Sequence, residues 1–255
     1  MSDVDAVPVV RLAKGSHHRH AGKMCAMNLV SRERGDWWIV DYPENVAPAL
    51  ARFAHHLNDR VCTHTEVEVD LLCGSCSAAV IDVAHAMVGT ADVPAELAWR
   101  WAGAVADLAA LELDRDYPWV AARLRGSAGS CRGIARQIAV SVPTSISVAT
   151  ESRAAGVSAS SALGDVLGRS DAAGTIRFAA RAVAVWHEMA GSVPVATPAQ
   201  VTTDAWTAAQ VHSDLYANLH QVPMGAWPVV PPTWLPAPGS PMPALSVAPS
   251  LVLTS

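Results

Sequence analysis

Apolar residues recur at helical spacing along most of the chain. In the clearest case Val46, Leu50, Phe53 and Leu57 lie at positions i, i+4, i+7 and i+11, which places them on one continuous face of a helix. Similar spacing elsewhere predicts a mainly helical protein. The predicted helices cover residues 21–33, 46–58, 77–88, 95–113, 118–125, 129–140, 158–167, 172–190 and 198–220.

Four stretches depart from this spacing. Residues 7–13 predict a short strand or extended arm, and the polar and apolar alternation of residues 66–70 suits one arm of a hairpin. Residues 143–161 are rich in Ser, Thr, Ala and Gly, so they predict either a linker or a poorly formed helix. The 34 residues from Val222 onward hold nine prolines and no charged side chain, which predicts a polyproline II or irregular tail.

Three regions follow from these patterns. Residues 1–92 form an N-terminal domain with a small inserted zinc-knuckle hairpin of the treble-clef or ribbon type. Residues 93–221 form an Ala-rich helical region, and residues 222–255 form the Pro-rich tail. The expected fold class is therefore mainly α, with a zinc knuckle inserted in a helical domain.

Composition narrows the class of protein. Hydrophobic residues make up 51% of the 255 residues and charged residues 16%, against about 25% in an average domain. The net charge of −5 gives no global signal for nucleic-acid binding. The first residues carry acids rather than a basic signal sequence, and no stretch of 18 apolar residues occurs. We therefore expect a cytoplasmic protein with no membrane partner.

Four soft metal ligands lie within fifteen residues. Cys62-x-His64 is followed by Cys73-x2-Cys76, and Zn²⁺ prefers four tetrahedral ligands drawn from thiolate and imidazole. The predicted helix after Cys76 would carry the second pair at its N-terminus, where the helix dipole favours thiolates. Four protein ligands predict a closed, structural zinc site. Two alternatives stay open: buried thiols beside a surface His64, or a redox pair formed by Cys73 and Cys76.

A weaker cluster of metal ligands lies upstream. His17, His20 and Cys25 are close enough in sequence to bind a transition metal, with Asp41 or Glu44 as a further acidic ligand. The simpler interpretation is a solvated turn that is rich in histidine.

Catalytic motifs of the common hydrolases, nucleotide-binding proteins and zinc proteases are absent from the sequence. His187-Glu188 lacks the second histidine of a zinc-protease motif, so it predicts a pair on the helix surface. Trp99 and Trp101 are two residues apart on a helix. We expect one of them in the core and the other at a helix–helix contact.

Several short motifs together suggest a relationship. In chain order they are Gly15-Ser16-His17, Met24-Cys25-Ala26-Met27, Leu57-Asn58-Asp59 and Met87-Val88-Gly89-Thr90. This series, over residues 12–92, resembles a family of uncharacterised actinobacterial and actinophage proteins. The chain departs from that family at Asn28, where the family has Glu, and around Tyr42-Pro43, where the family has a His and a Cys. The resemblance implies an actinobacterial or phage source and an Ala-rich helical second half, and it implies no activity.

Three functions are compatible with these observations. The first is a non-enzymatic binding or assembly protein with a protein partner and a structural zinc site. The second is a nucleic-acid-binding regulator that uses the zinc knuckle. The third is a metal-dependent enzyme that uses His17, His20 and Cys25. The absence of catalytic motifs and the closed ligand set favour the first.

Overall fold

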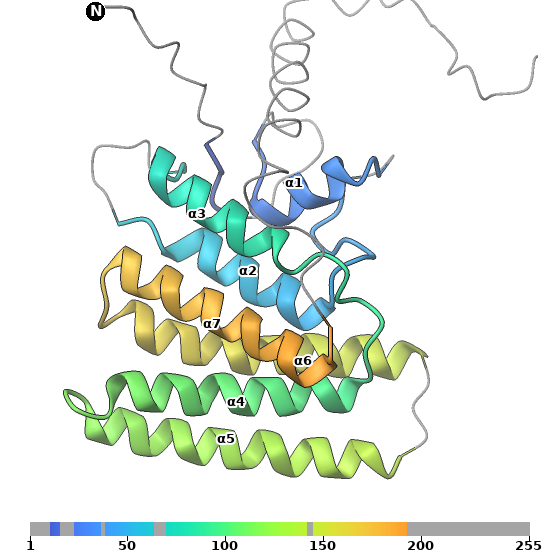
Figure 1. Ribbon diagram of the computed structural model, residues 1–255, viewed down its shortest axis with the longest axis vertical. Coiled ribbons are helices and arrows are strands. Elements are labelled where there is room, and N and C mark those ends of the chain that lie inside the picture. Colours follow the sequence, from blue (N-terminus) through green and yellow to red (C-terminus); the bar gives the residue numbers. More distant parts are fainter. Residues whose placement is uncertain (1–10, 16–22, 37–38, 64–69, 142–144, 193–255) are drawn as a thin grey trace, which may run out of the picture. The chain divides into compact units, whose positions relative to one another are not determined.

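The computed structural model describes residues 11–15, 23–36, 39–63, 70–141 and 145–192 (Figure 1). The chain divides into two units, residues 1–217 and 218–255, and every described residue belongs to the first. The described residues form seven helices, which confirms the mainly helical class. They are α1 (Ala26–Glu33), α2 (Pro48–Arg60), α3 (Gly74–His85), α4 (Ala95–Leu113), α5 (Pro118–Ala139), α6 (Ser145–Leu167) and α7 (Ala172–Ala190).

The helices pack around α2 and α4. α4 and α5 form an antiparallel hairpin, while α6 packs on both α2 and α4, and α1 and α3 lie on the far side of α2 (Figure 1). The described residues of the predicted regions 1–92 and 93–221 thus share one hydrophobic core. None of the described helices combines the length and the hydropathy that a membrane span requires.

Three aromatic rings from different helices form the centre of the core. The Trp101 ring on α4 makes edge contacts with Phe53 on α2 and Trp186 on α7, at centroid distances of 5.5 and 5.2 Å. The Trp101 indole N–H donates to the carbonyl of Ala182 at 2.7 Å. Trp99 instead lies at the contact with α6, where its indole N–H donates to Glu151 at 2.8 Å. The expected division of roles between the two tryptophans is confirmed.

Two predicted breaks in helical structure are absent. The helices predicted at 118–125 and 129–140 form the single helix α5, which ends at Ala139, because the intervening Gly and Ser residues are tolerated on its exposed face. Residues 145–161 form the first part of α6 rather than a linker. Their small side chains serve a close approach between helices: a Cβ atom on Gly156 would lie 2.6 Å from the carbonyl oxygen of Ala49 on α2.

The histidine of the predicted surface pair is buried. His187 is 5% exposed, and its Nε2 donates to the carbonyl of Ala86 at 2.7 Å, just after the end of α3. Only Glu188 faces solvent. The prediction of a surface pair was wrong for His187, because the apolar stripe of α7 that packs on α3 extends to its last turn.

The predicted extended segments are described only in part. Within the described residues the β-pairing is one isolated antiparallel bridge between Ala13 and Leu71. The predicted hairpin residues 66–69, the helix at 198–220 and the tail from residue 222 lie outside the described ranges.

The start of α7 allows a test of helix capping. The Asp171 carboxylate accepts a hydrogen bond from the backbone N–H of Gly174 at 2.6 Å. We expect Asp171→Ala to lower the free energy of unfolding by about 0.5–2 kcal/mol, because one N–H group at the helix start loses its partner. Asp171→Asn keeps an accepting oxygen and should retain most of the stability in thermal unfolding. An equal loss in both variants would show that the negative charge, not the hydrogen bond, stabilises the helix.

Candidate metal centre

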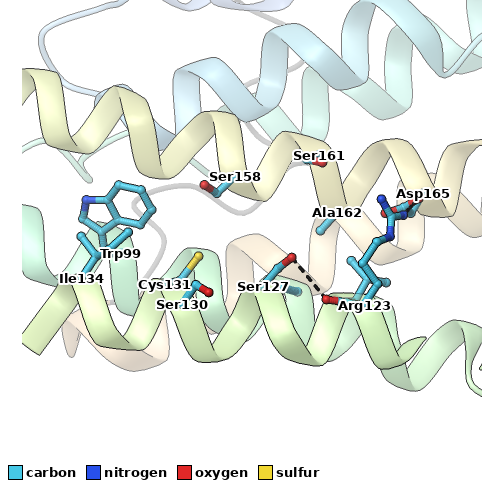
Figure 2. Close-up of a pocket in the computed structure, with 12 residues that line it drawn as sticks. Trp99, Arg123, Ser127, Ser130, Cys131, Ile134, Ser158, Ser161, Ala162 and Asp165 are labelled. Carbon is cyan, nitrogen blue, oxygen red and sulfur yellow. Dashed lines mark hydrogen bonds and ion pairs between the residues drawn. The ribbon is translucent and has the colours of Figure 1, made fainter. Parts of the chain in front are cut away.

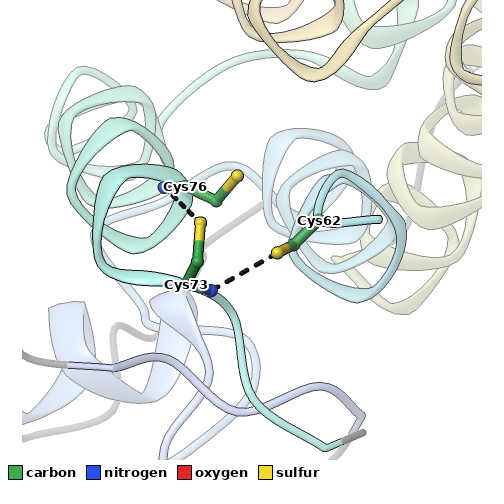
Figure 3. Close-up of side chains that lie close together, drawn as sticks. All are labelled: Cys62, Cys73 and Cys76. Carbon is green, nitrogen blue, oxygen red and sulfur yellow. Dashed lines mark hydrogen bonds between the residues drawn. The ribbon is translucent and has the colours of Figure 1, made fainter. Parts of the chain in front are cut away.

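Three cysteines meet where α2 ends and α3 begins (Figure 3). Sulfur atoms of Cys62, Cys73 and Cys76 all lie within 4.8 Å of one another. Cys62 follows α2, Cys73 is the N-cap residue of α3, and Cys76 lies in its first turn. Cys62 and Cys76 are buried, whereas Cys73 is half-buried. The spacing in the sequence thus corresponds to a real cluster of thiols.

The start of α3 sets the geometry of the C-x2-C pair. The Cys73 sulfur accepts a hydrogen bond from the backbone N–H of Cys76 at 3.4 Å, as an N-cap side chain does. The backbone N–H of Cys73 in turn donates to the sulfur of Cys62 at 3.3 Å. The helix start therefore directs two sulfurs to one point, and Cys62 reaches that point from the end of α2.

The N-terminal segment ties the two helix ends together. The Leu12 N–H donates to the Ser77 hydroxyl at 3.0 Å, and the Leu12 carbonyl accepts from the N–H of Leu72 at 2.8 Å. The Lys14 ammonium donates to the Cys62 carbonyl at 3.2 Å. This segment holds the three cysteines in place and brings a positive charge beside them.

The two sulfurs of the C-x2-C pair differ in their electrostatics. Burial alone would raise the pKa of the Cys73 thiol, but hydrogen bonds from Ser75, Cys76 and Cys62 outweigh it and lower that pKa to about 6. Burial, together with the neighbouring sulfurs Cys73 and Cys62, raises the pKa of Cys76 to about 12. Cys73 therefore loses its proton easily, whereas Cys76 would lose its proton only when a positively charged ion binds to its sulfur.

A metal ion fits the three sulfurs. Zn–S bonds near 2.3 Å in a tetrahedral site require sulfur atoms roughly 3.8 Å apart, which is compatible with a cluster that spans less than 4.8 Å. Three thiolates and a divalent ion carry a net charge of about −1, which the Lys14 ammonium partly offsets. The donor set of sulfurs suits a soft or borderline ion rather than calcium or magnesium.

The other residues predicted as metal ligands lie outside the three-cysteine cluster or outside the described residues. His64, the predicted fourth ligand, lies outside the described residues, as do His17 and His20. Cys25 is not part of the three-cysteine cluster, and lies instead within 4.8 Å of ligand atoms of Asp41 and His55. Glu44, the other acid considered for Cys25, forms an exposed ion pair with Arg34 at 3.1 Å.

His55 was missed by the analysis of the sequence. It lies 30 residues from Cys25 and within the regular helix α2, so no local spacing connects the two residues. The available signal was a histidine pair, His55-His56, in a helix that is otherwise largely apolar.

A groove between α5 and α6 is lined by several polar side chains (Figure 2). It has a volume of about 270 Å³, with α4 at its base. The hydroxyls of Ser127 and Ser130 donate to carbonyls one turn earlier in α5, and Arg123 pairs with Asp165 across the groove at 2.6 Å. The hydroxyls of Ser127 and Ser130 and the Arg123–Asp165 pair thus have partners within the protein, which does not favour a polar ligand there.

Comparison of the chain with protein-family models, with curated proteins and with solved structures found no match. The interpretation of both ligand clusters therefore depends on the geometry of this chain. The resemblance to actinobacterial and actinophage proteins stays a prediction.

Proposed function

We propose that Cys62, Cys73 and Cys76 bind a structural zinc ion, and that the chain is a non-enzymatic binding or assembly protein of actinobacterial or actinophage origin. The observation that supports the zinc ion is the convergence of three sulfurs from two helix ends. An ion at this point would join the end of α2 to the start of α3. Its role would then be to stabilise the fold, as in closed sulfur-rich sites.

The charges on the helices favour a protein partner over a nucleic acid. Three of the four arginines of α5 are paired with carboxylates: Arg123 with Asp165, Arg125 with Asp114 and Arg132 with Asp107. Such pairs leave less positive charge for a phosphate backbone. Retention on immobilised nucleic acid that falls steeply with salt would contradict this part of the proposal and would favour the regulator alternative.

Metal analysis tests the zinc ion. The full-length protein purified under reducing conditions should contain one more equivalent of zinc than the Cys73→Ser variant. Cys131→Ser is the matched control, because Cys131 is also buried but belongs to neither ligand cluster. We expect Cys131→Ser to keep the zinc content of the wild-type protein.

Removal of the ion should also lower stability. Relative to protein with free zinc at 1,000 times its Kd, chelation should lower the free energy of unfolding by about 4 kcal/mol, since the ion binds the folded state. Zinc should also protect Cys62, Cys73 and Cys76, but not Cys131, from alkylation. Zinc-free wild-type protein with unchanged stability, or a Cys73–Cys76 disulfide in the isolated protein, would contradict the proposal.

The fourth ligand needs a separate measurement. If His64 completes the site as predicted, His64→Ala should weaken zinc binding while the three cysteines remain protected at high zinc concentration. An unchanged zinc affinity would show that water or another residue takes the fourth position.

A further inference from the structure

A second group of metal ligands lies at the start of α1. It comprises a thiol, an imidazole and a carboxylate, whose ligand atoms all lie within 4.8 Å of one another. Cys25 is the N-cap residue of α1, Asp41 lies in the loop before α2, and His55 lies in α2. None of these residues takes part in the three-cysteine centre. Three separate elements therefore bring three different donors to one point.

The hydrogen bond of His55 fixes its ring for coordination. Its Nε2 atom lies 2.8 Å from the backbone carbonyl oxygen of Asp41, which can only accept a hydrogen bond, so Nε2 carries the proton. The Nδ1 atom then has a lone pair, and this atom faces the sulfur of Cys25 at 3.8 Å. Metal-binding histidines are held in the same way, with the distal N–H bonded to a carbonyl or carboxylate.

A buried amide positions the other two ligands. The Asn28 side chain donates to the Asp41 carboxylate at 3.0 Å, and its oxygen accepts from the backbone N–H of Cys25 at 3.4 Å. Asn28 is 2% exposed. One amide thus orients both the carboxylate and the segment that carries the thiol, as the outer shell of a metal site does.

The burial of Cys25 disfavours a cysteine nucleophile. The residue is 0% exposed, so a substrate cannot reach its sulfur. Asp41 is half-buried, and a divalent ion bound between the three donors would compensate the negative charge of its carboxylate.

We propose that Cys25, Asp41 and His55 form a second metal centre, which binds a divalent transition metal ion such as Zn²⁺ through one thiolate, one carboxylate and one neutral imidazole. Binding would release the thiol proton of Cys25 to solvent. The two negative ligands then balance the charge of the ion, which suits a site with little exposure to water. Three protein ligands leave one position of a tetrahedral zinc site for water or another oxygen donor.

Co²⁺ is a suitable probe, because its binding to thiolate produces a charge-transfer absorption. Metal-free full-length protein under reducing conditions should bind Co²⁺ in two classes of site. Cys25→Ser should lose one equivalent and leave the three-cysteine class intact, while Cys73→Ser should lose the other. Cys131→Ser should bind as the wild-type protein does.

Asp41→Asn is the variant that best preserves the fold. Its amide oxygen can still accept from Asn28, and the carbonyl that binds His55 belongs to the backbone. We expect the affinity of the second class for Co²⁺ to fall about tenfold or more, while circular dichroism shows unchanged helix content. The proposal is overturned if Cys25→Ser and Asp41→Asn both bind Co²⁺ as the wild type does, or if Cys73→Ser abolishes all binding. If Cys25→Ser loses one equivalent of Co²⁺ and Cys73→Ser loses none, the result supports the centre at Cys25 and contradicts the three-cysteine centre.

Discussion

Trp101→Ala is expected to lower the free energy of unfolding by about 3–5 kcal/mol. The substitution removes a fully buried ring at the junction of α2, α4 and α7, together with its edge contacts to Phe53 and Trp186. It also leaves the carbonyl of Ala182 without the indole N–H that it accepts in the native protein. Because domains are stable by only about 5–15 kcal/mol, this change removes a large share of the total.

Thermal unfolding followed by circular dichroism measures this loss. A decrease of 3–5 kcal/mol corresponds to a Tm that is about 6–20 °C lower in a domain of this size. Trp119→Ala is the matched control, since Trp119 is 66% exposed. Its ring lies beneath the Arg169 guanidinium and makes no ring–ring contact among the described residues. That variant should stay within about 1 kcal/mol of the wild type. Similar losses in the two variants would contradict the position of Trp101 at the centre of the core.

The second large effect concerns the crossing of α2 and α6. Gly156→Ala should lower the free energy of unfolding by about 1–3 kcal/mol. A Cβ atom at this position would lie 2.6 and 2.9 Å from the carbonyl oxygen and Cα of Ala49, and 2.9 Å from Cβ of Arg52. Two of these atoms belong to the backbone of α2, so the helices have to move apart.

Gly129→Ala gives the opposite sign and serves as the control. Gly129 lies on the exposed face of α5 with no atom within 4 Å of an added Cβ. Alanine there should raise the free energy of unfolding by about 0.5–1 kcal/mol through its higher helix propensity. Urea unfolding of both variants measures the difference. If Gly156→Ala also proves stabilising, α2 and α6 do not approach as closely as the structure indicates.

The helices with continuous apolar stripes were the easiest to predict. The bounds of α4 and α7 agree with the predicted 95–113 and 172–190, because leucine, valine and tryptophan positions mark their faces throughout. α6 was harder, since its first half packs through Gly and Ala. A small residue that allows close helix packing and a small residue in a linker look the same in a sequence.

The two ligand clusters also differed in how easily they could be predicted from the sequence. Cys62, Cys73 and Cys76 are close along the chain, so ligand spacing was enough to group them. Cys25 and His55 are 30 residues apart on different helices, and they meet only because α1 packs on α2. Local spacing carries no information about that packing. For the same reason the burial of His187, which depends on the end of α3, was not foreseen.

The central place of α2 has a consequence for biosynthesis. Its Ala49 N–H donates to the hydroxyl of Ser152, a residue 103 positions later in the chain. At elongation rates of about 5–20 residues per second, α2 leaves the ribosome roughly 5–20 s before its partner helix α6 has been made. During that interval the small, apolar face of α2 that later packs against α6 is open to solvent. Co-translational shielding of this face, by a chaperone or by early packing of α4, is therefore expected to affect the yield of folded protein.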